Sequence, residues 1–235
     1  MSNDKLSFGK GFRDGLPFVF VIVPFGMLFG VVATEAGLDL AQVMVMTVLV
    51  IAGASQFAAI QQMGDSAPVF IVLATALAVN LRMAMYSATM APHLGAAPLW
   101  KRAVAAYFLV DQSAVLATAE FEARPKATLA EKFAYFFGVV APIAPLWYGA
   151  TWIGAVVGGR IPESFALDFA MPITFLAMIA PMVKTLAHLG AALTSVVVAL
   201  ALAWMPYGTG LLVAAVCAMA VGSFIEVAQA RRAAA

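Results

Sequence analysis

The stretch "PVFIVLATALAVNLRMAMYSATMAP", residues 68–92, decides the fold class of this chain. Arg82 is its single charged side chain, and the next charge along the chain is Lys101. An apolar run of this length is enough to cross a hydrocarbon core of about 30 Å as a helix. The stretch therefore predicts a membrane-spanning helix that carries one arginine near its middle.

The whole chain has the composition of a polytopic membrane protein. Hydrophobic residues make up 64% of its 235 residues and charged residues 11%, whereas soluble domains have about 45–50% and about 25%. Both faces of the apolar segments are apolar, which favours helices over the alternating strands of a membrane barrel. A net charge of +1 provides no basic face for nucleic acid. We therefore expect the lipid bilayer as the surrounding medium and no nucleic-acid partner.

The apolar residues fall into about eight segments of spanning length. They cover residues 16–34, 41–63, 67–91, 103–119, 133–157, 166–183, 186–203 and 209–227. The sequence thus predicts an all-α, polytopic integral membrane helix bundle with broken or kinked helices near 53–56 and 80–82. A re-entrant or broken helix would also fit segments 41–63 and 67–91 and the closely spaced pair 166–183 and 186–203.

We expect a single membrane domain, residues 1–235, with two possible halves of four spans. The polar loop 120–132 separates these halves, residues 1–119 and 133–235. Each half has a GxxxG sequence near its first helix, "GMLFG" from Gly26 and "GAVVG" from Gly154, a spacing that lets helix backbones approach closely. A duplicated transporter half is one interpretation, and chance matches in a chain with 18 glycines are the other.

The basic residues predict the orientation of the chain. With eight spans and a cytoplasmic N-terminus, the outer segments hold only Lys101, Arg102 and Arg160. The inner segments then hold Lys5, Lys10, Arg13, Arg124, Lys126, Lys132, Lys184, Arg231 and Arg232. Because cytoplasmic loops carry the excess of Lys and Arg, both termini are expected in the cytoplasm.

Arg82 needs a partner, because a charge near the bilayer centre costs about 2.5–3.5 kcal/mol on insertion scales. Asp111, in "FLVDQSAV", lies at the middle of segment 103–119 and at a matching depth, so we expect the two residues to pair. In one interpretation the pair only locks two helices together. In the other it lies in a transport path, where Arg82 binds a substrate carboxylate or Asp111 gains and loses a coupling proton.

The stretch "IAGASQFAAIQQ", residues 51–62, is a second candidate element of a site. Its Gly-Ala-Ser sequence is a weak point in a helix, and a break would present helix ends and carbonyls to zwitterions and ions. The other interpretation is a close-packed surface in which a buried carboxamide hydrogen-bonds to a neighbouring helix. Asn80, a further candidate on segment 67–91, points about 200° away from Arg82 on an ideal helix. The candidate substrate-binding residues are thus Gly53, Ser55, Gln56, Asn80, Arg82 and Asp111.

The sequence carries no pattern for metal or cofactor chemistry. His93 and His188 are far apart, so no metal site is expected. We find no phosphate-cradling loop and no nucleophile elbow. We therefore expect a protein that is not an enzyme and has no cofactor, and an ATP-driven pump would need a separate subunit.

The chain resembles the azaleucine-resistance (AzlC) family, the large subunit of branched-chain amino acid exporters, over about residues 8–227. Several separated motifs occur in the order seen in that family. They are "GLPFVFVIVPFGMLFG" from Gly15, "AGASQFAAI" from Ala52, "VNLRMAMYSATMAPHL" from Val79, "FLVDQSAV" from Phe108 and "GRIPESFALDFAMPITFLA" from Gly159.

This resemblance implies an inner-membrane exporter of leucine, isoleucine, valine and similar hydrophobic amino acids, driven by an ion gradient. It also implies a small AzlD-type membrane subunit with four spans. The chain has Gln112 and Met83 where the family often has Glu and His, so two titratable groups beside the suspected site are missing and the coupling ion is not fixed. The alternative, from another class, is a non-transporting membrane scaffold in which Arg82 and Asp111 only pack helices.

Overall fold

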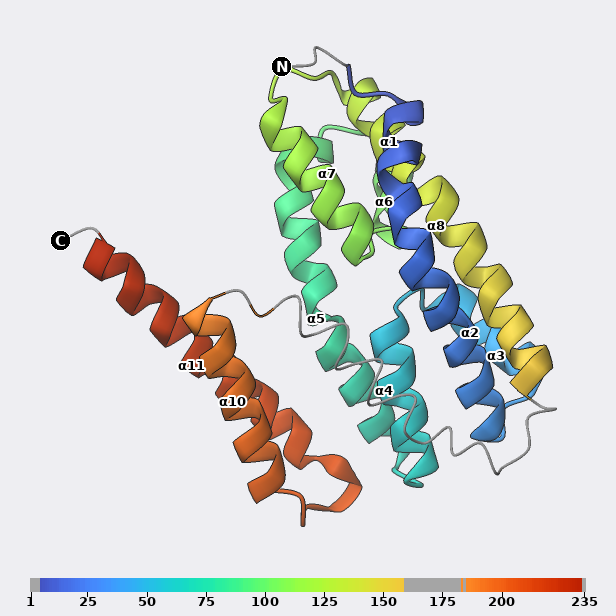
Figure 1. Ribbon diagram of the computed structural model, residues 1–235, viewed down its shortest axis with the longest axis vertical. Coiled ribbons are helices and arrows are strands. Elements are labelled where there is room, and N and C mark those ends of the chain that lie inside the picture. Colours follow the sequence, from blue (N-terminus) through green and yellow to red (C-terminus); the bar gives the residue numbers. More distant parts are fainter. Residues whose placement is uncertain (1–4, 159–182, 184, 234–235) are drawn as a thin grey trace. The chain divides into compact units, whose positions relative to one another are not determined.

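The computed structural model describes residues 5–158, 183 and 185–233 (Figure 1). These residues form helices joined by turns and short links. Among them, four helical stretches are long and apolar enough to span a membrane: Phe8–Glu35, Val69–Leu94, Leu129–Gly158 and Gly210–Gln229. The predicted all-α membrane fold is therefore confirmed, whereas the predicted number of eight spans is not.

The described residues fall into two compact units. The first comprises residues up to 60 together with 79–158, and the second comprises residues 61–78 together with those from 183 onward. We describe each unit by itself. The two halves expected from the sequence, 1–119 and 133–235, stay a prediction.

Two long helical stretches form the frame of the first unit. One is built from α1 (Phe8–Gly15), the 3-10 turn η1 (Leu16–Phe18) and α2 (Val19–Glu35). The other is α8 (Leu129–Gly158). Lipid offers no hydrophobic driving force between helices, so such a pair is stabilised by close van der Waals contact along its length.

Glycines bring the backbones of these two stretches into contact. Gly11 lies against the backbone of Tyr135, and Gly30 lies against the backbones of Thr151 and Gly154, so that a side chain at either glycine would overlap α8. Residue numbers rise in the same direction along both helices, which therefore run parallel. The two GxxxG sequences seen in the chain thus pack against each other.

The segment 41–63, predicted as a span, is instead two short helices. These are α3 (Leu40–Leu49) and α4 (Gly53–Gly64), with residues 50–52 between them. The predicted break near 53–56 is therefore present, and it lies immediately before the first of these positions.

Contacts with the frame show that α4 turns back on α3. α3 runs from the end of α2 towards the middle of α8, where Thr47 accepts a hydrogen bond of 2.8 Å from the indole nitrogen of Trp147. α4 begins at this level, with Gly53 against the ring of Trp147. One turn later the ring of Phe57 lies 5.6 Å from that of Phe29, closer to the end of α2. The two helices form a hairpin that returns to the end from which it started.

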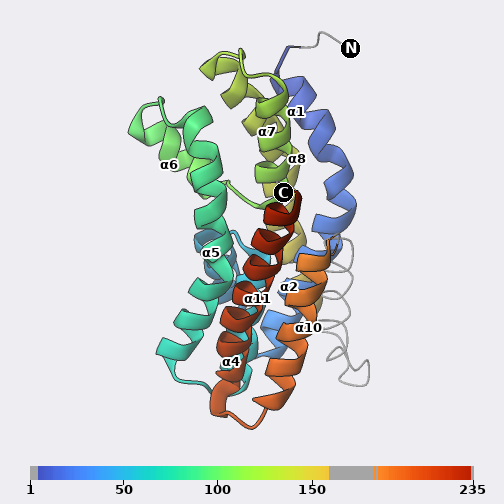
Figure 2. The same cartoon turned by 90° about the vertical axis from the view of Figure 1, so that its left-hand side faces the viewer.

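The segment 103–119, also predicted as a span, is a second hairpin. It consists of α6 (Leu99–Tyr107) and α7 (Asp111–Ala123), and residues 108–110 form its tip. Four residues separate the end of α5 (Val69–Leu94) from the start of α6. In both Figure 1 and Figure 2 the two arms of this hairpin lie at the end of the unit where α1 begins.

Side-chain contacts confirm the direction of α7. At its start, Asp111 contacts Arg82. Near its end, the ring of Phe121 lies 5.5 Å from that of His93, at the end of α5. α7 therefore runs alongside the second half of α5 and in the same direction, away from the middle of the molecule.

α5 itself is helical from Val69 to Leu94 without interruption. Of the predicted break or kink near 80–82, the break is therefore wrong. The physical reason is that the charge on Arg82 is matched by a side chain of another helix, so the backbone of α5 keeps its own hydrogen bonds.

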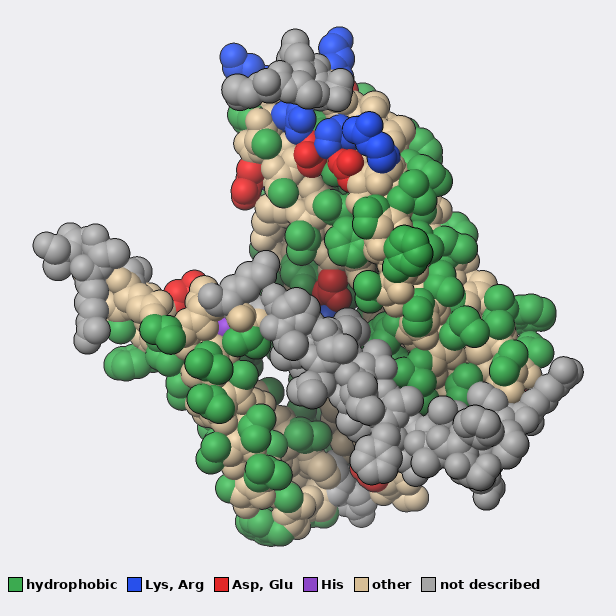
Figure 3. Space-filling model, in the orientation of Figure 1, with side chains coloured by type: hydrophobic (Ala, Val, Ile, Leu, Met, Phe, Trp, Pro, Cys, Tyr) green, Lys and Arg blue, Asp and Glu red, His purple; other side chains and the backbone are tan. Residues whose placement is uncertain are grey.

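The two hairpins also correct the predicted sidedness of the loops. Because α6 and α7 start and finish at the same end, Lys101 and Arg102 lie at the end where α1 begins, and not at the opposite end as eight spans would require. Figure 3 shows Lys and Arg side chains gathered at one end of this face. The described basic residues of the first unit other than Arg82 belong to this basic end: Lys5, Lys10, Arg13, Lys101, Arg102, Arg124, Lys126 and Lys132.

The second unit contains a pair of packed helices near the C-terminal end of the chain. α10 (Leu186–Ala201) is followed by the 3-10 turn η5 (Pro206–Gly208) and by α11 (Gly210–Ala233). These helices match the predicted segments 186–203 and 209–227. The predicted segment 166–183 lies, except for its last residue, outside the described residues.

Candidate functional site

Arg82 pairs with Asp111, as the sequence predicts. Nη1 of Arg82 lies 2.9 Å from Oδ2 of Asp111, and the two side chains are 26% and 31% exposed. One turn further along α5, the hydroxyl of Tyr86 donates a hydrogen bond of 2.8 Å to Oδ1 of Asp111. Asp111 is also the first residue of α7, where the positive end of the helix dipole favours a carboxylate. α5 and the tip of the second hairpin are thus joined by a charge pair and a charged hydrogen bond.

Ser113 fixes the shape of this tip. Its buried hydroxyl accepts a hydrogen bond of 2.9 Å from the Val110 amide and donates one of 2.8 Å to the Phe108 carbonyl. A break between two helices leaves backbone groups unpaired, and in a membrane each such group is costly. The serine satisfies two of them and so holds the start of α7, with Asp111, in place.

The tip of the first hairpin is held in a similar way. The hydroxyl of Ser55 donates a hydrogen bond of 2.9 Å to the Ala52 carbonyl. Gly53 has no room for a side chain, because a Cβ there would lie 2.6 Å from the ring of Phe25 and 2.8 Å from that of Trp147. In this structure Gly53 and Ser55 therefore shape the tip.

The two tips meet beside the middle of α8. The hydroxyl of Tyr107, at the end of α6, donates a hydrogen bond of 2.5 Å to the Val48 carbonyl near the end of α3. The same oxygen lies 2.8 Å from the hydroxyl of Tyr148 on α8. Since the single proton of Tyr107 is used on Val48, Tyr148 is the donor in this second bond. One tyrosine thus connects both hairpins to the frame.

Several buried polar atoms of the first unit have no hydrogen-bond partner among the described residues. They are both polar atoms of the Gln56 carboxamide, Oδ1 of Asn80, Nε of Arg82 and Oγ1 of Thr151. Gln56 and Thr151 are fully buried. An unpaired buried polar group costs about 1–3 kcal/mol, and in native proteins such groups are usually met by water or a ligand. A polar ligand that hydrogen-bonds to any of these atoms would therefore remove this free-energy cost.

The structure brings some of the candidate residues together and not others. Arg82 and Asp111 touch, and Gly53, Ser55 and Gln56 share the tip of the other hairpin. Asn80 lies on α5, but a continuous helix turns it about 200° away from Arg82. The arrangement is thus one charge pair at one tip and one unpaired carboxamide at the other.

Two tyrosines of this region were not among the residues predicted from the sequence. Tyr86 follows Arg82 by four positions, which places both on one face of α5, and this spacing is a signal that the sequence contains. Tyr107 gives no comparable signal, because its contacts are with residues far away in the chain. Within the described residues, no three His, Cys, Asp or Glu side chains are grouped so as to hold a metal ion.

Comparisons with known proteins place the chain among membrane proteins. Residues 17–161 match the family model described as AzlC protein. The chain is 25% identical to the inner membrane protein YgaZ of Escherichia coli over 179 residues, which are 74% of this chain and 72% of that protein. It is 28% identical over 200 residues to an uncharacterized membrane protein of Archaeoglobus fulgidus, covering 83% and 84% of the two chains.

A third relative is an uncharacterized membrane protein of Helicobacter pylori, 26% identical over 176 residues, which are 73% of this chain and 75% of that protein. No solved structure matches the chain. The segment that matches the family model contains both hairpins and the Arg82–Asp111 pair. The chain therefore belongs to the AzlC family of membrane proteins.

Proposed function

We propose that this protein is a secondary transporter that exports branched-chain amino acids across the inner membrane. The observation that carries the proposal is the Arg82–Asp111 pair at the tip of a hairpin, next to the tip of a second hairpin. Ionisable residues within membrane segments usually belong to substrate or ion paths. Helices that end at mid-membrane depth are a recurrent feature of secondary-transporter binding sites.

The charge pair suits a zwitterion. The planar guanidinium of Arg82 binds the substrate carboxylate in place of Asp111. Asp111 then pairs with the ammonium group of the same substrate, so neither charge is left without a partner in the membrane. The unpaired carboxamide of Gln56 is a further donor and acceptor for a bound amino acid.

The apolar residues of the two tips favour an aliphatic substrate. The second tip consists of Phe108, Leu109 and Val110, and the first contains Val50 and Ile51. These apolar residues accept leucine, isoleucine or valine, and they offer no partner to a polar or charged side chain, whose burial would be costly.

Asp111 is the candidate for coupling transport to an ion gradient. A proton on its carboxylate would weaken the bond to Arg82 and free the guanidinium before substrate arrives. Loss of that proton as substrate binds would restore the negative charge that pairs with the substrate ammonium group. The function proposed here is transport without enzyme activity or a cofactor, and it includes a small four-span AzlD-type membrane subunit as partner. The basic end of the first unit is assigned to the cytoplasm, together with both termini, because cytoplasmic loops carry the excess of Lys and Arg.

Counterflow in proteoliposomes tests this function. Vesicles that contain the full chain and its small subunit are loaded with unlabelled leucine and placed in labelled leucine. Labelled leucine is expected to accumulate transiently, and unlabelled isoleucine or valine should compete while glutamate and lysine should not. Absence of exchange for all three branched-chain amino acids, under both a proton and a sodium gradient, would refute the proposal.

A non-transporting membrane scaffold is the second candidate. It is favoured by the bonds that Asp111 forms with Arg82 and Tyr86, because they also hold α5 to α7. In that case the full chain and its subunit show no counterflow, and removal of either charge lowers the yield of folded protein.

A further inference from the structure

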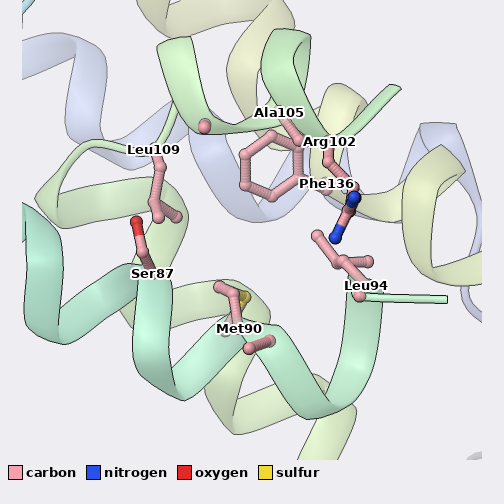
Figure 4. Close-up of a pocket in the computed structure, with 10 residues that line it drawn as sticks. Ser87, Met90, Leu94, Arg102, Ala105, Leu109 and Phe136 are labelled. Atoms are coloured by element: carbon pink, nitrogen blue, oxygen red, sulfur yellow. The ribbon is translucent and has the colours of Figure 1, made fainter. Parts of the chain in front are cut away.

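A cavity of about 210 Å³ lies between the second half of α5, the α6 arm of the second hairpin and α8 (Figure 4). It is smaller than the roughly 300–1,000 Å³ of pockets for drug-sized ligands. Its walls are mostly apolar and include Met90, Leu94, Ala105, Leu109 and Phe136.

The two polar side chains of the cavity lie at its opposite ends. Figure 4 shows Arg102 beside Leu94 at one end, and Ser87 beside Leu109 at the other. Arg102 is exposed and forms no ion pair within the described residues. Its guanidinium is therefore available to an anion that comes from outside.

The cavity leads from the basic end of the unit towards the charge pair. Arg102 belongs to the basic end, together with the neighbouring Lys101. At the inner end, Ser87 directly follows Tyr86, whose hydroxyl bonds to Asp111. Leu109 is part of the tip that Asp111 terminates.

We infer that this cavity is a waiting site for substrate on the cytoplasmic side, in which Arg102 holds the carboxylate and the apolar walls hold the aliphatic chain. The inference rests on the proposed function, since it names a second binding place for the same substrate. A guanidinium with free donors binds a carboxylate in bidentate fashion, and an apolar cavity of this size takes a small branched chain.

The cavity recognises the carboxylate and the aliphatic chain of an amino acid, but not its ammonium group. No Asp or Glu side chain lines it, so a substrate ammonium group finds no charged partner there. A branched aliphatic acid without the amino group therefore binds this site as well as leucine does. Such a compound lacks the group that would pair with Asp111, so it occupies the waiting site and blocks leucine.

The test uses 4-methylpentanoate, which has the carbon skeleton of leucine without the amino group. Its binding to the purified full chain with its small subunit is measured by equilibrium dialysis, and its inhibition of leucine counterflow is measured when it is added on the side of the basic end. Arg102→Gln is expected to weaken both about ten-fold, because a hydrogen-bonded charge is lost. Lys101→Gln, next to it on α6, should change neither.

A second variant keeps the test independent of the arginine. Ala105 is buried in the cavity wall, and Ala105→Phe should fill the cavity and abolish binding of 4-methylpentanoate. Unchanged binding in Arg102→Gln would overturn the inference, and so would unchanged binding in Ala105→Phe. Stronger binding of hexadecanoate than of 4-methylpentanoate would overturn it as well, since it would identify a site for lipid acyl chains.

The outcome for the waiting site can be separated from that for the transport function. If leucine exchanges normally but binding of the acid ignores Arg102, the waiting site is refuted and the transport function stands. If binding of the acid depends on Arg102 and leucine does not exchange, the cavity binds carboxylates as inferred and the transport function is refuted.

Discussion

At the scale of single residues, the carboxylate of Asp111 is held in place by two side chains and by its position at the start of a helix. It accepts bonds from Arg82 and Tyr86, and it lies at the first position of α7. Arg82, in contrast, keeps its Nε without a partner in the described part of the chain. The guanidinium therefore has donors left for a ligand, while the carboxylate is held in place.

Tyr86→Phe removes one of the bonds to Asp111 and leaves the aromatic ring. We expect a loss of about 1.5 kcal/mol in unfolding free energy, at the lower end for a hydrogen bond to a charged group because the carboxylate is partly exposed. Thermal unfolding in detergent measures this loss of stability. Thr89→Val, a change on the same helix that removes only a bond to the helix's own Met85 carbonyl, is the control. Equal unfolding temperatures for the two variants would contradict the supporting role of Tyr86.

The sequence was sufficient to find the pair but not its surroundings. Arg82 and Asp111 could be matched because both are charges inside apolar segments, where an unpaired charge is costly. Asp111 begins a helix because the chain turns back at residues 108–110. A count of apolar residues cannot predict such a turn. A helix-start signal was nevertheless present, since Asp111 and Ser113 are residue types that favour the first positions of helices.

At the scale of helices, the two hairpins are the main departure from the predicted spans. Hydropathy measures the length of an apolar segment and carries no information on direction. Segments 41–63 and 103–119 each contain two short helices whose combined length equals one crossing. Only tertiary contacts, such as that of Tyr107 with Val48, show that each pair folds back.

The glycine spacing in α2 and α8 indicated close helix packing, but it did not indicate that these two helices contact each other. Gly30→Ala is expected to destabilise the protein by about 1–3 kcal/mol, because the added methyl group would overlap the backbone of Thr151. Gly149→Ala on α8 is a matched control, since a Cβ there meets nothing within 4 Å, and alanine favours a helix by about 0.5–1 kcal/mol. Unfolding temperatures should fall for the first and hold or rise for the second. A Gly30→Ala protein as stable as the Gly149→Ala protein would refute the close packing.

At the scale of the whole molecule, the hairpins determine which loops share a side of the membrane. With α6 and α7 returning to their starting end, the described basic residues of the first unit, apart from Arg82, share one end. The prediction of eight crossings had placed Lys101 and Arg102 opposite to Lys10. The revised arrangement agrees more closely with the rule that cytoplasmic loops carry the excess of Lys and Arg.

Cysteine labelling in intact cells tests this sidedness. In a chain with Cys217→Ser, single cysteines are placed by Ala36→Cys, Ala96→Cys and Lys126→Cys, all at exposed loop positions. A membrane-impermeant maleimide should label the first from outside, and the other two only after the membrane is opened. Labelling of Ala96→Cys in intact cells would mean that residues 103–119 cross the membrane.

The central claim is that substrate exchanges partners with the Arg82–Asp111 pair at the meeting point of the two hairpins. The double variant Arg82→Gln/Asp111→Asn removes both charges together, so no charge is left buried alone and folding should be nearly unaffected. Glu122→Gln, an exposed carboxylate of α7, is the control.

The decisive measurement is the initial rate of labelled-leucine exchange by this double variant in proteoliposomes, relative to the wild-type chain at equal amounts of folded protein. We predict a fall of at least about 100-fold, equivalent to about 2.7 kcal/mol, while the Glu122→Gln protein keeps the wild-type rate. A double variant that folds normally and exchanges leucine at the wild-type rate would contradict the account, because the pair would then only join α5 to α7.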